Sequence, residues 1–305
     1  MTRVAAVDCG TNSTRLLVAD VVDGTTVWRD RDAVTTRLGQ GVDRVGRLRP
    51  EAVARTAEVI GGYAARWRAL GCERVAVVAT SAVRDVADRT AFHDAVEAAS
   101  GVRPDVLDGD EEAALAFDGA VAGVDPARPA LVLDIGGGST ELILGRARPE
   151  VSESRQIGSV RLTERLLRDD PPSPAALSAA ARLVDGELAE VARRLDPARA
   201  QSLVAVAGTA TTLAALHLGL EAYDPGAIHA TALGRADAER LLAELGASTA
   251  ARIASLGPVA PGREDVLAAG ALILERVMAW GGFEEVVVSE RDLLDGLCRA
   301  LAAAG

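Results

Sequence analysis

The chain repeats one sequence pattern at two places about half its length apart. VAAVDCGTNSTRLLVAD begins at Val4 and ALVLDIGGGSTELILGR begins at Ala130, with an offset of 126 residues between matching positions. The identical positions pair Asp8 with Asp134, Gly10 with Gly136, Ser13 with Ser139, Thr14 with Thr140, and Leu16 with Leu142. Internal repetition of this kind indicates a duplicated structural unit. We therefore predict two similar domains, residues 1–125 and 126–305, that face one another across a cleft.

Each half begins with short apolar runs and continues with alternating strands and helices, which is typical of an α/β fold. In the first half, three strands joined by a hairpin turn at Asp23-Gly24 are expected to form an antiparallel start. A helix with apolar residues at helical spacing follows from Pro50 to about Leu70. The expected strands are 3–7, 14–21, 25–28, 74–79, 104–107, 130–134, 140–144, 203–207 and 285–288, and the other expected helices are 88–100, 111–121, 174–195, 236–245, 264–280 and 293–304.

The composition is that of a globular protein, because 49% of the 305 residues are hydrophobic and 25% are charged. No apolar run reaches the length of a membrane span, and no signal peptide is apparent, so a cytoplasmic protein without a membrane partner is expected. The three cysteines are far apart and suggest neither a disulfide framework nor a zinc site. A net charge of −11 argues against a nucleic-acid partner.

The chain contains no lysine, so all 33 basic residues are arginine. Walker-type P-loops and protein kinases use a lysine on the phosphates, and both classes are therefore disfavoured. Schiff-base chemistry needs a lysine amine and is excluded.

The first copy of the repeat carries a loop that could hold an anion. Gly10 lets the backbone approach a ligand closely, and Thr11, Asn12 and Ser13 add hydrogen-bond donors. The alternative is a simple turn whose polar side chains satisfy its own backbone. This loop alone does not separate the two interpretations.

The second copy favours a ligand more clearly. Three consecutive glycines, Gly136, Gly137 and Gly138, stand between two good strands, where a plain hairpin would hardly need them. Together with Ser139 they are predicted to bind phosphate. Asp134 and Glu141 flank the loop and are suited to Mg²⁺, which prefers oxygen ligands. We include Asp8, the counterpart of Asp134, among the predicted metal ligands.

Two further motifs lie between the copies. TSAVR ends at Arg84 just after an expected strand, where ligands usually bind in α/β sheets, and its guanidinium can hold phosphate oxygens. GDEEA opens an expected helix, where Asp110 and Glu111 can be explained as caps. Arg15 lies inside the first loop motif, and Arg155, Arg161, Arg263 and Arg291 are further candidates for a basic lining.

The two Asp-Gly loops on duplicated halves resemble the superfamily of actin, sugar kinases and heat-shock ATPases, whose fold is ribonuclease-H-like. Within it, DCGTNS, TSAVR, GDEEA and DIGGGSTE closely resemble the exopolyphosphatase and guanosine pentaphosphate phosphohydrolase family. GTATT at residues 208–212, REDVLAAG at 263–270 and SERDLLDG at 289–296 extend the resemblance over nearly the whole chain. The length resembles that of the short, two-domain members.

The resemblance implies roles for particular residues. Glu112 corresponds to the presumed catalytic base, Arg84 to a phosphate-contacting arginine, and Thr209 lies in a later motif that we assign to phosphate binding. It implies a magnesium-dependent hydrolase that removes terminal phosphates from polyphosphate, with short chains as the expected substrate, and a possible homodimer. Guanosine pentaphosphate hydrolysis, an ATP-dependent kinase and a noncatalytic polyphosphate or alarmone sensor are the alternatives.

Overall fold

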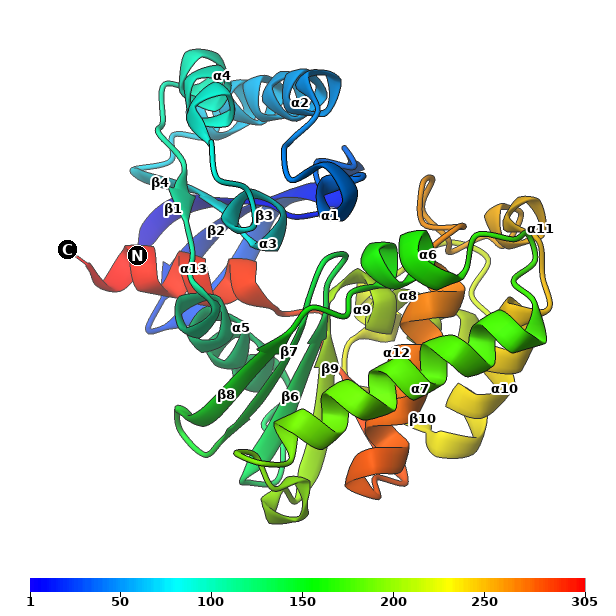
Figure 1. Cartoon of the computed structure of the whole chain (residues 1–305). Coiled ribbons are helices and arrows are strands. Elements are labelled where there is room, and N and C mark those ends of the chain that lie inside the picture. The colour runs from blue at the N-terminus through cyan, green and yellow to red at the C-terminus, as the bar shows by residue number, and fades with distance from the viewer. Residues whose placement is uncertain (305) are drawn as a thin grey trace. The chain divides into compact units, whose positions relative to one another are not determined.

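The computed structural model describes residues 1–304 and contains two compact units (Figure 1). The first unit combines residues 1–119 with 293–304, and the second is Ala120–Asp292. The predicted boundary between residues 125 and 126 stays a prediction. In the structure, the C-terminal helix belongs to the first unit.

The first unit is built on a five-stranded sheet in the order β3-β2-β1-β4-β5. Its strands are β1 (Thr2–Cys9), β2 (Ser13–Val22), β3 (Thr25–Thr35), β4 (Arg74–Ala79) and β5 (Asp105–Val106). The predicted antiparallel start is confirmed, because β2 pairs antiparallel with both β1 and β3. The turn between β2 and β3 is the predicted one, and both Asp23 and Gly24 have a positive φ, as a tight hairpin requires.

Helices cover both faces of the first sheet. The helices of this unit are α1 (Val42–Val45), α2 (Pro50–Ala69), α3 (Ser81–Arg84), α4 (Thr90–Ser100), the first part of α5 (Gly109–Val124), and α13 (Leu293–Ala303). Alternate residues of β1 and β2 pack with α2 and α4 in one core. Helix α13 packs on the same sheet, although it is the last element of the chain (Figure 1). Its buried Asp295 accepts hydrogen bonds from Thr26 Oγ1 (2.5 Å) and Trp28 Nε1 (2.9 Å).

The second unit repeats the strand order of the first. Its sheet runs β10-β11-β9-β6-β7-β8, so that β8, β7, β6, β9 and β11 correspond to β3, β2, β1, β4 and β5. The strands are β6 (Ala130–Ile135), β7 (Thr140–Gly145), β8 (Pro149–Arg155), β9 (Ser202–Val206), β10 (Thr231–Gly234) and β11 (Glu285–Val288). The same antiparallel and parallel pairings recur. The predicted α/β class with a duplicated domain is confirmed.

The helices of the second unit enclose one large apolar core. They are α6 (Ser159–Leu166), α7 (Pro174–Val191), the short η1 (Pro197–Arg199), α8 (Ala207–His217), α9 (Pro225–Ile228), α10 (Arg235–Gly246), α11 (Ala250–Ala254) and α12 (Leu267–Gly281). Helix α12 is buried along most of its length and contacts α7 and α10 (Figure 1). Among residues 1–304, no helix has both the length and the apolar character that spanning a membrane would require.

Candidate phosphate-binding site

The loop of the first unit is held in a tight turn at the end of β1. The amide of Gly10 donates to the carbonyl of Ser13 (3.1 Å), and a Cβ at Gly10 would lie only 3.1 Å from that oxygen. Within residues 1–304, no backbone carbonyl accepts a hydrogen bond from the amides of Thr11 or Asn12. Backbone amides that are not used within the chain can donate hydrogen bonds to an anion. This geometry is compatible with the phosphate interpretation of the loop and also with a plain turn.

The loop of the second unit has the same local geometry. Gly136 donates to the carbonyl of Ser139 (3.0 Å), and a Cβ at Gly136 would again lie 3.1 Å from that carbonyl oxygen, three positions along the chain. In the described part of the chain, the amides of Gly137, Gly138 and Ser139 donate to no backbone carbonyl. Three consecutive donors are therefore available for phosphate oxygens.

The start of α6 fixes the carbonyl side of this second loop. The amide of Ser159 donates to Gly136 O (2.9 Å), and Arg161 donates from its amide to Gly137 O (3.0 Å) and from Nε to Gly138 O (2.7 Å). Burial, with a contribution from the neighbouring Arg165, lowers the pKa of Arg161 to about 10. Its guanidinium is still charged at neutral pH. Arg161 thus brings a cation to the loop while holding the loop's carbonyl groups.

The residues flanking the two loops differ in charge. Asp8 lies opposite Arg15 in the β1–β2 register, and its Oδ2 accepts a 2.8 Å hydrogen bond from Arg15 Nη2. At the corresponding place in the second unit, Asp134 lies opposite Glu141. Asp134 is 7% exposed and Glu141 is 1% exposed. One loop is therefore flanked by an acid–base pair and the other by two buried acids.

The TSAVR motif lies beside the first loop. Thr11 Oγ1 and Ser81 Oγ are 3.0 Å apart, and both side chains are buried. From the other end of this short helix, Arg84 Nη1 donates to Glu112 Oε2 (2.7 Å) and to the carbonyl of Leu107 (3.1 Å). Three motifs that are separate in the sequence are thus linked within the first unit. Ser81 was inside the quoted motif, but nothing in the sequence singled it out.

The acidic residues at the start of α5 have two different roles: some cap the helix, and Glu112 does not. Asp108 Oδ1 accepts from the amides of Asp110 (2.9 Å) and Glu111 (2.8 Å), and Glu111 Oε2 accepts from the amide of Asp108 (3.0 Å). This reciprocal pair is a capping box. Glu111 caps the N-terminus of α5 and is exposed. Glu112 is 7% exposed and pairs with Arg84 instead.

Thr209 lies in the first turn of α8, directly after β9. Because Asp134 is paired with Val206 in the sheet, this helix begins at the same sheet edge as the second loop. A Cβ at Gly208 would lie 2.1 Å from the guanidinium of Arg263, so that arginine packs against the glycine backbone. The placement agrees with a ligand site at the carboxyl ends of the strands.

Arg155 lies outside this group of residues, whereas the acid pair of the second loop lies within it. Arg155, a candidate for the basic lining, pairs with Glu187 on α7 (2.5 Å). Within residues 1–304, no cluster of three or more His, Cys, Asp or Glu side chains is arranged to hold a metal ion. Asp134 and Glu141 form a pair of acids, which is compatible with Mg²⁺ because that ion usually takes one or two carboxylates and completes its shell with water and phosphate. Ser154 Oγ, on the unpredicted strand β8, donates to Glu141 Oε1 (2.7 Å).

The fold and these loops define a two-domain α/β protein with a glycine-containing turn at the same place in each unit. The chain belongs to the Ppx/GppA phosphatase family, because residues 17–301 match the sequence model of that family. It is 43% identical to Exopolyphosphatase 2 of Mycobacterium tuberculosis over 99% of both chains. A crystallised exopolyphosphatase-like protein, 36% identical, superposes with a TM-score of 0.92 and 97% coverage of both chains. The Ppx/GppA family member from Aquifex aeolicus, 28% identical, superposes with a TM-score of 0.84 over 99% of this chain and 98% of that one.

Proposed function

We propose that this chain is an exopolyphosphatase that hydrolyses the terminal phosphoanhydride bond of inorganic polyphosphate and releases orthophosphate. The observation that carries the proposal is the buried carboxylate of Glu112, which stands outside the capping box and pairs with Arg84. A carboxylate in that position can orient or deprotonate an attacking water. The 43% identity to a whole-length exopolyphosphatase supports the same reaction.

The phosphate chain would be bound by backbone amides and arginines. Thr11 and Asn12 in the first loop, and Gly137 to Ser139 in the second, offer amide donors to phosphate oxygens. Arg15 and Arg84 carry guanidinium groups whose planar geometry suits two oxygens at once. Both arginines pair with carboxylates here, so we expect phosphate to compete for their donors.

Asp134 and Glu141 would hold the divalent cation. Like charges placed directly opposite each other across an antiparallel pair destabilise it, and a cation relieves this repulsion. A bound Mg²⁺ would neutralise charge on the transferring phosphoryl group. Asp8 is already neutralised by Arg15, so its predicted role as a third ligand has less support. In this proposal the side chain of Thr209 and the amides at the start of α8 contact further phosphates.

The preference for short chains remains part of the proposal, as do a cytoplasmic location and a homodimer. The amides and arginines of the proposal all contact phosphate groups, which make up the whole of polyphosphate and only part of a nucleotide. Guanosine pentaphosphate presents the same terminal group and is the principal alternative substrate.

The test is orthophosphate release by the purified protein with Mg²⁺ from short polyphosphate, long polyphosphate, guanosine pentaphosphate and ATP. We expect turnover to be fastest with short polyphosphate. Faster turnover of guanosine pentaphosphate would identify that compound as the preferred substrate, and the protein would still be a phosphoanhydride hydrolase. Binding of polyphosphate without release from any of the four compounds would contradict the proposed activity.

A further inference from the structure

Helix α8 runs from the candidate phosphate site to a cavity. Its first turn carries Gly208 and Thr209, and its last turn carries Leu216, which lines a pocket of about 490 Å³. This volume is within the range of small-molecule sites, which is roughly 300–1,000 Å³. The other walls come from the turn after α8, from α10, from α11 and from the segment that follows α11.

Leucine side chains supply most of the wall. Leu241 and Leu245 are buried at the base, whereas Leu216, Leu220 and Leu256 are only partly buried. These surfaces would bind the apolar part of a ligand, because removing apolar area from water is favourable. The pocket therefore suits a ligand with a hydrocarbon or aromatic part.

The backbone around the pocket is closely packed. A Cβ at Gly257 would lie 1.8 Å from the carbonyl oxygen of Glu221, so the two segments that meet there touch through their main chains. Ser248 Oγ donates to the carbonyl of Glu244 (2.8 Å) at the end of α10. Thr249 caps α11 by accepting from the amide of Arg252 (3.2 Å). These contacts fix the element that carries Arg252.

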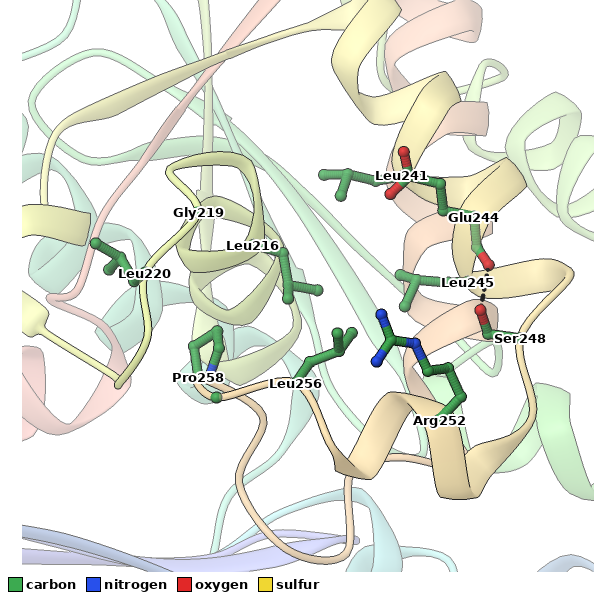
Figure 2. A pocket seen from close by; sticks show the side chains of 11 residues that line it. Leu216, Gly219, Leu220, Leu241, Glu244, Leu245, Ser248, Arg252, Leu256 and Pro258 are labelled. Atoms are coloured by element: carbon green, nitrogen blue, oxygen red, sulfur yellow. Dashed lines mark hydrogen bonds between the residues drawn. The ribbon is translucent and has the colours of Figure 1, made fainter.

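One guanidinium is directed into the leucine-lined space. Figure 2 shows the Arg252 side chain pointing between Leu245 and Leu256. Within residues 1–304, no carboxylate lies within ion-pair distance of Arg252, and its Nη1 donates only to Ser255 Oγ (3.2 Å). Guanidinium has five N–H donors in a fixed planar arrangement, so a bidentate contact with a carboxylate is still available.

The one acid on the wall does not neutralise this arginine. Glu244 Oε1 accepts from Arg240 Nη1 (3.0 Å), and its carboxylate points away from Arg252 in Figure 2. The pocket therefore combines apolar walls with a single cation that has no acidic partner in the described chain.

We propose that this pocket is a binding site for a small amphipathic carboxylate, whose carboxylate pairs with Arg252 and whose apolar body lies against the leucines. The site is distinct from the candidate phosphate site, since the two are at opposite ends of α8. Inorganic phosphate and polyphosphate have no apolar part and are not expected to bind there.

The test uses octanoate as the probe, with octylamine as the oppositely charged analogue, and measures binding by isothermal titration calorimetry. We expect octanoate to bind the wild type with octylamine at least about tenfold weaker, since a charge-assisted pair is worth about one decade or more. Arg252→Gln should weaken octanoate at least about tenfold. Arg235→Gln removes the same charge from α10, where Arg235 pairs with Glu239, and should leave octanoate binding unchanged.

Three results would overturn the proposal. They are no octanoate binding to the wild type, equal binding of octylamine, and octanoate binding that Arg252→Gln does not change. Arg252 is exposed, so its variant is expected to fold, and a circular dichroism melt checks this. Because the readout is binding and not phosphate release, failure here leaves the proposed hydrolase untouched.

Discussion

Arg84 Nη1 lies 2.7 Å from Glu112 Oε2 and 3.1 Å from the carbonyl oxygen of Leu107. One guanidinium therefore joins a loop carbonyl to the candidate base at the start of α5. We expect Arg84→Gln to raise the KM for polyphosphate about tenfold, because the side chain also serves as a phosphate ligand in the proposal. The free energy of unfolding should fall by roughly 1–3 kcal/mol, since Glu112 loses a buried partner.

The control is another arginine of the first unit. Arg103 pairs with Glu97 at 2.9 Å, but both side chains are about half exposed or more. Surface pairs of this kind contribute roughly 0–1 kcal/mol. Arg103→Gln should therefore change neither KM nor stability appreciably. Steady-state kinetics and urea unfolding of both variants decide the matter, and identical KM values for the two would remove Arg84 from the site.

Gly158 makes the second loop sensitive to a single methyl group. A Cβ at Gly158 would lie 2.3 Å from the carbonyl carbon and oxygen of Gly137. Gly158→Ala must therefore displace the loop, and we expect a loss of at least about tenfold in kcat/KM, as misplaced catalytic groups typically cause. Gly186 lies inside α7 with open space around it. Gly186→Ala should keep full activity and add roughly 0.5–1 kcal/mol of stability.

The opposed acids Asp134 and Glu141 predict that removing one negative charge changes both the Mg²⁺ requirement and the stability of the protein. Glu141→Gln should raise the Mg²⁺ concentration for half-maximal activity by about tenfold, because one of two carboxylates is lost. The same variant should be slightly more stable than the wild type in EDTA, by roughly 0.2–1 kcal/mol, because like charges no longer oppose each other. Asp8→Asn is the comparison, and should affect the Mg²⁺ requirement less. Unchanged Mn²⁺ affinity of Glu141→Gln, measured by electron paramagnetic resonance, would refute the assignment.

Asp20 gives the fold a pH dependence that is independent of the site. Hydrogen bonds from Arg3 (2.6 Å), and then from Arg29 (2.7 Å), hold the pKa of this carboxyl group at about 2. Its unfolded pKa is about 3.9. Because the folded pKa is the lower one, the stabilisation is present above the unfolded value and is lost as pH falls toward 2.

Asp20→Asn should therefore lower the free energy of unfolding at pH 7 and lower it less at pH 3. We expect a loss of roughly 1–3 kcal/mol at pH 7. Asp94→Asn, at an exposed position on α4, is the control and should have little effect at either pH. Urea unfolding at the two pH values measures both variants, and a loss that is the same at pH 3 would contradict the account.

Much of the fold could be predicted because local patterns and tertiary burial agree. Strand β4 was predicted with its observed bounds, and β1 and β6 have apolar runs that are buried on both faces. Helix α2 begins at the predicted Pro50. Strand β8 was missed because PEVSESR has no apolar alternation, and its pairing with β7 holds it at the sheet edge. The place of α13 in the first unit follows from contacts between residues far apart in the chain, such as Asp295 and Thr26, which are 269 positions apart.

The candidate site was predictable only in part. The glycine-rich loops could be found from the sequence because glycines between good strands need an explanation. The capping box also has a sequence signature, since Asp108 precedes Glu111 by three positions. The pairing of Arg84 with Glu112 spans 28 residues and is a tertiary contact, which no local sequence pattern reports. The roles of these residues in the reaction remain predictions.

The most direct measurement compares orthophosphate release from short polyphosphate by Glu112→Gln and Glu111→Gln. The two positions are adjacent and the substitutions are chemically the same, but Glu111 belongs to the capping box and Glu112 pairs with Arg84. The account predicts that Glu112→Gln lowers kcat by at least about a hundredfold, the usual contribution of a general base, while Glu111→Gln stays within about twofold of the wild type. Equal activity of the two variants would contradict the assignment of Glu112 as the base.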